Sequence, residues 1–184
     1  WGVASLPTTV GHSTSEILDA LHTGDIDSLL IGGVDPLDIS RDAAKGLEKA
    51  FVVSLEIRKS QITELANVVL PVAAVAEKSG TFINWEGRAR AFDTAIDTPN
   101  LRSDVRILSM LADEMGTPIN LPTVESAARE MNSLGTWDGA RVNFTPANAG
   151  SVSGETILSS WRLLLDAGSL QDGEANLAKT AHPS

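Results

Sequence analysis

Three short runs of consecutive apolar residues divide the first part of the chain, at 28–34, 50–55 and 67–71. Helical patterns separate these runs. Continuous apolar runs of this length are typical of strands buried on both faces of a parallel sheet. The alternation of strand and helix therefore predicts an α/β fold with a mainly parallel sheet joined by right-handed crossovers.

The helical segments between the apolar runs carry recognisable ends. Ser13 begins a capping-box pattern before a short amphipathic stretch, and Gly24 is placed to end it. Asp35 precedes a proline and is expected to cap a helix that continues to about residue 50, although Gly46 weakens that helix. One or two helical turns are expected over 60–66.

Helical patterns return in the second half of the chain. Ser103 is expected to cap a helix that Gly116 ends, and another helix is expected over 123–131. A stretch rich in Gly, Asn and Pro follows. Ser153 then precedes an amphipathic helix ending at Gly168. The expected architecture is a Rossmann-like sheet flanked by helices, with a helical C-terminal part, in a single α/β region spanning residues 1–184.

Residues 72–97 differ from both flanks because they are polar and interrupted by glycine, with embedded aromatic side chains. They predict a long irregular loop or a small hairpin. Such a segment either lines a ligand site or holds ion pairs where domains meet. The structural alternative is slightly favoured, with Trp85 and Phe82 expected to anchor the loop by burial. Its ion pairs and backbone hydrogen bonds would come from Glu77, Lys78, Glu86 and Arg88.

Composition excludes several classes of function. The net charge is −10 and no basic stripe is present, so nucleic-acid binding is not expected. No apolar run approaches the roughly 20 residues of a membrane helix, so direct membrane insertion is not expected. The chain has no cysteine, which removes thiolate ligands for zinc or iron–sulfur clusters. Because it starts at Trp1 without a visible signal peptide, we expect an internal fragment of a longer protein.

No catalytic or metal-binding residue is expected. The three histidines have no metal-ligand spacing, and no nucleophile elbow is present. Gly32 and Gly33 follow the first apolar run, where α/β sheets bind phosphates. However, neither glycine-rich nucleotide fingerprint occurs, and the anionic Asp35 would repel a phosphate. A free-standing nucleotide-binding module is therefore disfavoured.

Two segments resemble the molybdopterin oxidoreductase superfamily. The turn after the first strand reads LLIGGVDP over 29–36, and ANVVLP over 66–71 is followed by EKSGTFINWEGR over 77–88. The similarity is strongest over residues 28–116. The segment 161–174 also resembles actinobacterial forms of the large iron–sulfur subunit of bacterial NADH–quinone oxidoreductases.

The departures from the superfamily pattern bear on cofactor binding. Asp35 stands where many members have asparagine, and the second strand leads into Glu56-Ile57-Arg58-Lys59 instead of an acidic residue and a threonine pair. Members use these regions to hold a pterin, so the resemblance implies a vestigial pocket and no bound cofactor. Its candidate residues are Gly32, Gly33, Asp35, Glu77, Lys78, Gly80, Asn84, Glu86, Gly87 and Arg88.

The resemblance implies a non-catalytic part of an oxidoreductase that carries electrons from NADH through FMN and iron–sulfur clusters to quinone, coupled to proton translocation. The clusters would lie elsewhere in the full-length parent. Expected partners are the other domains of its own chain and other peripheral-arm subunits, on the cytoplasmic side of the plasma membrane. The alternative is a cofactor-lining part of an active molybdopterin oxidoreductase such as a formate dehydrogenase.

Overall fold

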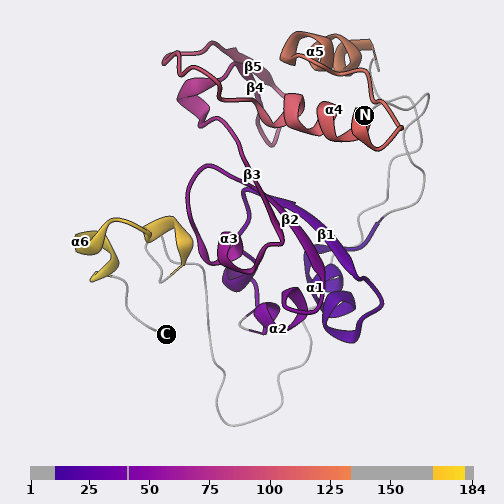
Figure 1. The fold of residues 1–184 in the computed structure, drawn as a ribbon. Coiled ribbons are helices and arrows are strands. Elements are labelled where there is room, and N and C mark those ends of the chain that lie inside the picture. The colour runs from indigo at the N-terminus through magenta and orange to yellow at the C-terminus, as the bar shows by residue number, and fades with distance from the viewer. Residues whose placement is uncertain (1–10, 41, 134–167, 181–184) are drawn as a thin grey trace, which may run out of the picture. The chain divides into compact units, whose positions relative to one another are not determined.

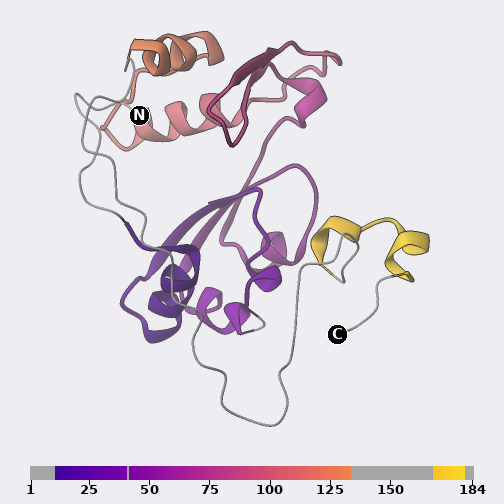
Figure 2. The ribbon, with the colours of Figure 1, turned by 180° about the vertical axis from the view of Figure 1, so that it is seen from behind.

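The computed structural model describes residues 11–40, 42–133 and 168–180. The chain divides into two compact units, Trp1–Gly135 and Thr136–Ser184. The first unit holds both sheets and helices α1 to α5, as Figures 1 and 2 show. The amphipathic helix predicted before Gly168 lies outside the described residues.

The first sheet has three parallel strands in the order β1-β2-β3. They are β1 (Ser28–Gly32), β2 (Phe51–Glu56) and β3 (Val68–Pro71). All three lie within a residue or two of the predicted runs, so the α/β class and the parallel sheet are confirmed. Strand β1 ends earlier than predicted because Gly33 takes a left-handed conformation, with φ of 65°.

Helix α1 (Thr14–Thr23) forms as predicted. The Ser13 N–H donates to the Glu16 carboxylate at 2.6 Å, and the Glu16 N–H donates to the Ser13 hydroxyl at 3.4 Å. This pair satisfies two backbone groups that a helix start leaves open. Gly24 ends the helix in the left-handed conformation, with φ of 87°.

The helix predicted from Asp35 to about residue 50 is wrong as one element. A 3-10 helix, η1 (Pro36–Asp38), comes first and is followed by the short α2 (Ala43–Leu47). Gly46 lies buried inside α2, where a Cβ atom would be 3.1 Å from the backbone nitrogen of His22. The glycine thus allows α2 to approach α1 closely. The predicted turns near residue 60 form α3 (Gln61–Leu65).

Helices α1, α2 and α3 pack on the same face of the sheet and enclose its core. The buried cluster consists of Leu18, Leu21, Ala43, Leu47, Val52 and Ile62. It takes residues from each of the three helices and from the central strand. Burial of these side chains is the main favourable term holding the layers together.

After β3 the chain leaves the sheet and forms a long loop over residues 73–102, whose two ends lie together. We call this loop the excursion. It passes through the 3-10 helix η2 (Val75–Glu77) and the antiparallel hairpin β4 (Gly80–Ile83) and β5 (Ala89–Phe92). On its return, the Arg102 carbonyl accepts a hydrogen bond from the Ala73 N–H at 2.8 Å. The sequence predicted either an irregular loop or a small hairpin here, and the pairing of β4 with β5 shows that the hairpin forms.

Helices α4 (Asp104–Glu114) and α5 (Val124–Ser133) follow and agree with the sequence prediction. The described part of the second unit contains the 3-10 helix η3 (Ser169–Gln171) and the short α6 (Ala175–Ala178). Among the described residues, no helix combines the length and the apolar character that crossing a membrane requires.

The central strand generates a prediction about stability. The Ser54 side chain is fully buried, and its hydroxyl has no hydrogen-bond partner among the residues that the structure describes. An unsatisfied buried hydroxyl costs free energy, so we expect Ser54→Ala to raise the free energy of unfolding by about 1 kcal/mol. Urea denaturation measures this change. As a control, Leu47→Ala in the same core should lower it by about 2–5 kcal/mol. A destabilised Ser54→Ala variant would contradict the prediction.

Candidate functional site

The ten residues that the sequence analysis named as candidates for a vestigial pocket fall into three local groups, each with hydrogen bonds within the chain. The first group is the turn after β1. Gly33 supplies its left-handed backbone, and the Asp35 carboxylate accepts a hydrogen bond from the Leu37 N–H at 3.0 Å. Asp35 therefore caps η1 with its own side chain. The N–H group that could face a phosphate already has an anionic acceptor.

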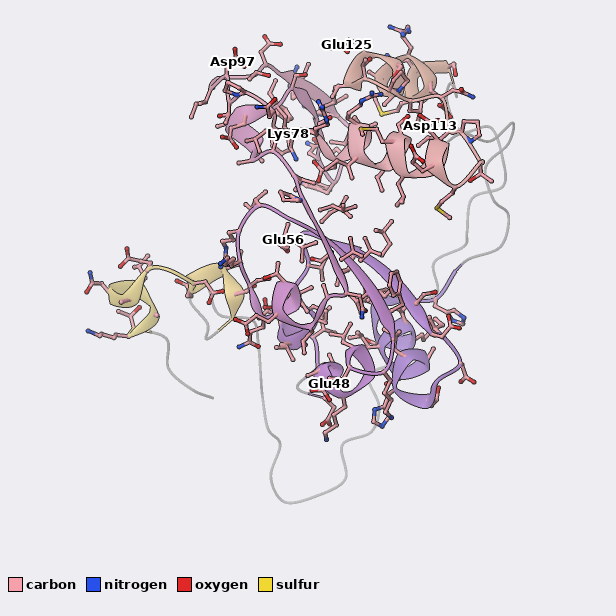
Figure 3. All side chains as sticks on the ribbon, viewed as in Figure 1. Glu48, Glu56, Lys78, Asp97, Asp113 and Glu125 are labelled. Atoms are coloured by element: carbon pink, nitrogen blue, oxygen red, sulfur yellow. The ribbon has the colours of Figure 1, made fainter. Side chains whose placement is uncertain are left out.

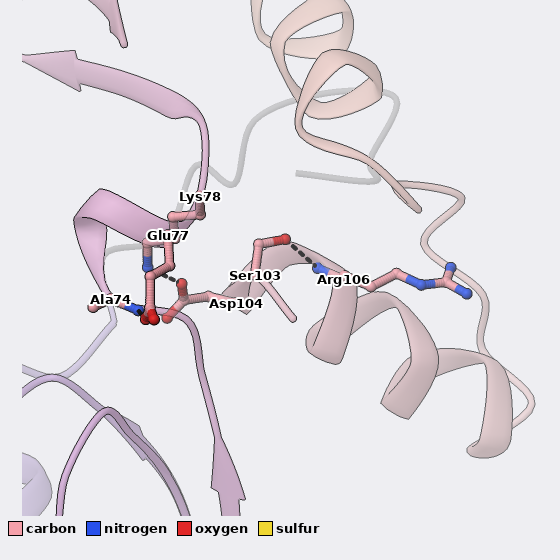
Figure 4. A network of polar contacts seen from close by, with 6 residues as sticks. All are labelled: Ala74, Glu77, Lys78, Ser103, Asp104 and Arg106. Carbon is pink, nitrogen blue, oxygen red and sulfur yellow. Dashed lines mark hydrogen bonds and ion pairs between the residues drawn. The ribbon is translucent and has the colours of Figure 1, made fainter. Parts of the chain in front are cut away.

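Glu77 and Lys78 form the second group, at the start of the excursion. The Glu77 carboxylate accepts hydrogen bonds from the Thr98 hydroxyl at 2.7 Å and from the Ala74 N–H at 3.0 Å. These two hydrogen bonds hold the pKa of Glu77 below its ordinary value, and the one from Thr98 has the larger effect. Figure 4 shows Glu77 beside Ala74. The Glu77 carboxylate thus links the start of the excursion to its later part.

Lys78 pairs with Asp104, the first residue of α4. The Ser103 hydroxyl caps the same helix by accepting a hydrogen bond from the Arg106 N–H at 3.4 Å. A carboxylate in the first helical turn is favourable because the backbone dipoles place partial positive charge there. Asp104 therefore serves both the helix and the ammonium group of Lys78.

The turn of the hairpin makes up most of the third group. The Asn84 side-chain oxygen accepts hydrogen bonds from the N–H groups of Glu86 at 3.0 Å and Arg88 at 2.9 Å. Gly87 has φ of 78°, which the end of a short hairpin loop requires. The Glu86 carboxylate and the Arg88 guanidinium lie 2.9 Å apart. The predicted ion pair and backbone hydrogen bonds are therefore present in this turn.

Gly80 occupies the strand end opposite Phe92. A Cβ atom at Gly80 would lie 2.7 Å from the Phe92 ring, so only glycine leaves room for that ring without a shift. The ring stacks on Phe82, with their centroids 4.6 Å apart. Aromatic stacking of this kind stabilises the hairpin beyond simple burial.

The prediction that Trp85 and Phe82 anchor the loop by burial is wrong for this chain. Trp85 is 93% exposed at the tip of the turn, and Phe82 is 58% exposed despite its stacking on Phe92. Trp85 lies within the turn that the Gly87 N–H closes by donating to the Asn84 carbonyl at 2.9 Å. The hairpin is fixed by its turn and its ring pair, and the tryptophan contributes no burial.

A cavity of about 520 Å³ opens at the carboxyl ends of β2 and β3, the edge at which open α/β sheets bind ligands. None of the ten candidate residues lines it. The cavity is lined by Glu56, Ile57, Arg58, Lys59, Thr63, Glu64, Val69 and Pro71. The lining thus combines two acidic and two basic residues with the apolar Ile57, Val69 and Pro71. The sequence signal that could have located it is the position of 56–59 directly after the second strand. Figure 3 labels Glu56 at this edge.

The described residues contain no group of three or more histidine, aspartate or glutamate side chains placed to hold a metal ion. The charged side chains of the candidate pocket bind to groups of their own chain. The arrangement of these residues stabilises a turn, a loop and a hairpin.

Comparison with known proteins gives the class of this protein. A family model for molybdopterin oxidoreductase matches residues 2–114, and the chain belongs to that family. It is 44% identical to the G subunit of the NADH-quinone oxidoreductase of Streptomyces coelicolor over 99% of this chain and 23% of that protein. The G subunit of Mycobacterium tuberculosis is also 44% identical, over 98% of this chain and 24% of its own length.

A more distant relative is the alpha subunit of the F420-dependent formate dehydrogenase 2 of Methanococcus maripaludis. It is 35% identical over 73% of this chain and 20% of its own length. The chain thus spans about a quarter of the length of the G-subunit relatives.

The hairpin turn provides a test of which interactions carry its stability. The Arg88 side chain is 68% exposed, so Arg88→Ala should lower the free energy of unfolding by about 1 kcal/mol or less. Asn84→Ala removes two hydrogen bonds to the turn backbone and should cost more, about 1–2 kcal/mol. Chemical denaturation compares the two variants. A larger loss for Arg88→Ala than for Asn84→Ala would contradict this ranking.

Glu77 gives a pH-dependent prediction. Its pKa is lowered in the folded chain, so its ionised form is favoured by folding. The stability it contributes is present above 4.5, the ordinary pKa of glutamate, and is lost as the pH falls through the lower folded pKa. Denaturation at a series of pH values should show a smaller acid-induced loss for Glu77→Gln than for the unmodified chain. Equal acid profiles for both proteins would refute the assigned role.

Proposed function

We propose that this chain is a structural, non-catalytic part of the large iron–sulfur subunit, the G subunit, of an NADH–quinone oxidoreductase. The observation that carries the proposal is 44% identity to relatives of that kind along nearly the whole chain. The longer subunit would take part in electron transfer from NADH through FMN and iron–sulfur clusters to quinone, coupled to proton translocation. This part would hold its neighbours in position.

The 184 residues form, in this proposal, one α/β region within the molybdopterin-oxidoreductase-like domain of a longer chain. The length of the relatives, about four times that of this chain, supports this interpretation. Its partners are the remaining domains of the same polypeptide and other peripheral-arm subunits. The complex would lie on the cytoplasmic side of the plasma membrane, and this part would contact neither nucleic acid nor the membrane interior.

The candidate pocket is, in this proposal, vestigial and holds no cofactor, catalytic group or metal. Its residues fit a bulky anionic pterin poorly. Asp35 is a carboxylate at the turn and already caps η1, while Lys78 and Arg88 already pair with Asp104 and Glu86. Iron–sulfur clusters would be held by cysteines elsewhere in the subunit, since this chain has none.

The alternative is a cofactor-lining part of an active molybdopterin oxidoreductase such as a formate dehydrogenase. Two observations favour keeping it: the identity to the Methanococcus maripaludis protein and the cavity at the carboxyl ends of β2 and β3. The alternative is the weaker of the two, because that relative is 35% identical over 73% of the chain.

Metal and cofactor analysis of the full-length protein separates the two functions. We expect iron and acid-labile sulfide in stoichiometric amounts, with no molybdenum and no pterin, and NADH–quinone oxidoreductase activity in the assembled complex. Stoichiometric molybdenum or pterin would overturn the proposal in favour of the alternative. Deletion of residues 28–116 should abolish assembly of the complex, and a complex that assembles and reduces quinone without them would refute the structural role.

A further inference from the structure

The excursion forms its hydrogen bonds almost entirely within itself. The Ala76 carbonyl accepts hydrogen bonds from the N–H groups of Ala95 at 2.9 Å and Ile96 at 2.8 Å, and the two hairpin strands pair with each other. Within the described part of the chain, the hydrogen bonds of residues 74–101 join these residues to one another, with Lys78 as the one exception. The segment is therefore a nearly closed unit of polar contacts.

Burial contributes little to holding this segment in place. The core cluster and the side chains packed against it all lie within residues 17–66. Ala73, at the first end of the excursion, is 1% exposed, whereas none of the residues 74–101 is buried. Apolar burial is the dominant favourable term in folding, so a segment that lacks it has low local stability.

One side-chain contact joins the segment to the element that follows it. Lys78 pairs with Asp104 of α4, and the two side chains are 21% and 45% exposed (Figure 4). A pair that is partly shielded from water keeps more of its attraction than an exposed pair. Helix α4 does not need this pair for its own start, since the Ser103 hydroxyl caps it. The pair can therefore break while α4 stays folded.

The hairpin has little stability of its own. Strands β4 and β5 have four residues each and form a two-stranded sheet. An isolated two-stranded hairpin is marginally stable at best in water. Release of the segment at its base therefore leaves the hairpin unable to persist, so that the base and the hairpin lose their structure together.

We propose that residues 74–101 open as one cooperative unit while the parallel sheet and helices α1 to α4 stay folded, and that the Lys78–Asp104 ion pair sets how often they open. Elements that move in proteins are drawn from such units of low stability. This conformational device needs neither a cofactor nor electron transfer, so the inference goes beyond the proposed function and does not rest on it.

Native-state hydrogen exchange of the full-length subunit tests the inference. Mass spectrometry with fragmentation to single amides compares β4 and β5 with the central strand β2. We expect the hydrogen-bonded amides of the hairpin to exchange at least about a hundredfold faster than those of β2, with similar protection in both hairpin strands, because a unit that opens as a whole gives its amides one opening free energy. Hairpin amides that exchange as slowly as those of β2 would overturn the proposal, since another part of the polypeptide would then hold them.

The role of the ion pair is tested with Lys78→Met, which removes the ammonium group and keeps a long side chain. We expect protection in both hairpin strands to fall by the same factor, about three- to tenfold, while β2 is unchanged. Lys78→Arg retains the positive charge and should keep most of the protection. Arg88→Met is the matched control, because Arg88 is 68% exposed and pairs within the turn. It should change the protection by less than about twofold.

Three results with the variants would contradict the proposal. Unchanged protection in Lys78→Met would refute the role of the pair. A loss confined to amides next to Lys78 would show fraying of the base instead of a cooperative opening, and a simultaneous loss in α4 would place that helix in the same unit. The comparison of hairpin and β2 in the unmodified subunit needs no substitution, so it decides the matter if a variant fails to fold. Hydrogen exchange does not depend on metal content, so this inference can fail while the metal analysis supports the proposed function.

Discussion

The structure depends on the burial of the central strand β2 beneath three helices. Val52 lies fully buried at the middle of the sheet and contacts the cluster to which α1, α2 and α3 each contribute. None of these helices is long, and α2 and α3 have five residues each. Isolated helices of that length are not stable in water, so they form here because packing on β2 holds them. The turn after β1 and the cavity edge keep their geometry for the same reason.

Much of this arrangement could be predicted from the sequence, because strand length and apolar continuity are local properties. The three strands, the capping of α1 by Ser13 and the start of α4 at Ser103 all follow from patterns within a few residues. The division of the segment after Asp35 into η1 and α2 could not be predicted in this way. The close approach of α2 to α1 at Gly46 could not be predicted either, because the contact with His22 is not local in sequence.

The candidate site shows the same difference between local and distant interactions. Ion pairing of Glu86 with Arg88 could be predicted because the two side chains lie on one short turn. The partner of Lys78 could not, since Asp104 is reached only after the chain has completed the hairpin. Burial of Trp85 was wrongly predicted because aromatic character indicates a preference for an apolar contact and does not identify where the contact lies. The cavity beside 56–59 was missed since it arises from three elements together.

The excursion between β3 and α4 begins and ends at one point, where the Ala73 N–H meets the Arg102 carbonyl. Lys78 and Asp104 form an ion pair close to the same point. The path of the chain from β3 to α4 therefore depends on these two contacts and not on the segment between them. The entropic cost of closing a loop grows only slowly with its length. The segment between the two contacts can therefore become longer or shorter, or change its sequence, at a small cost in free energy. The hairpin can therefore change in length or content while the ends of β3 and α4 keep their positions at Ala73 and Arg102.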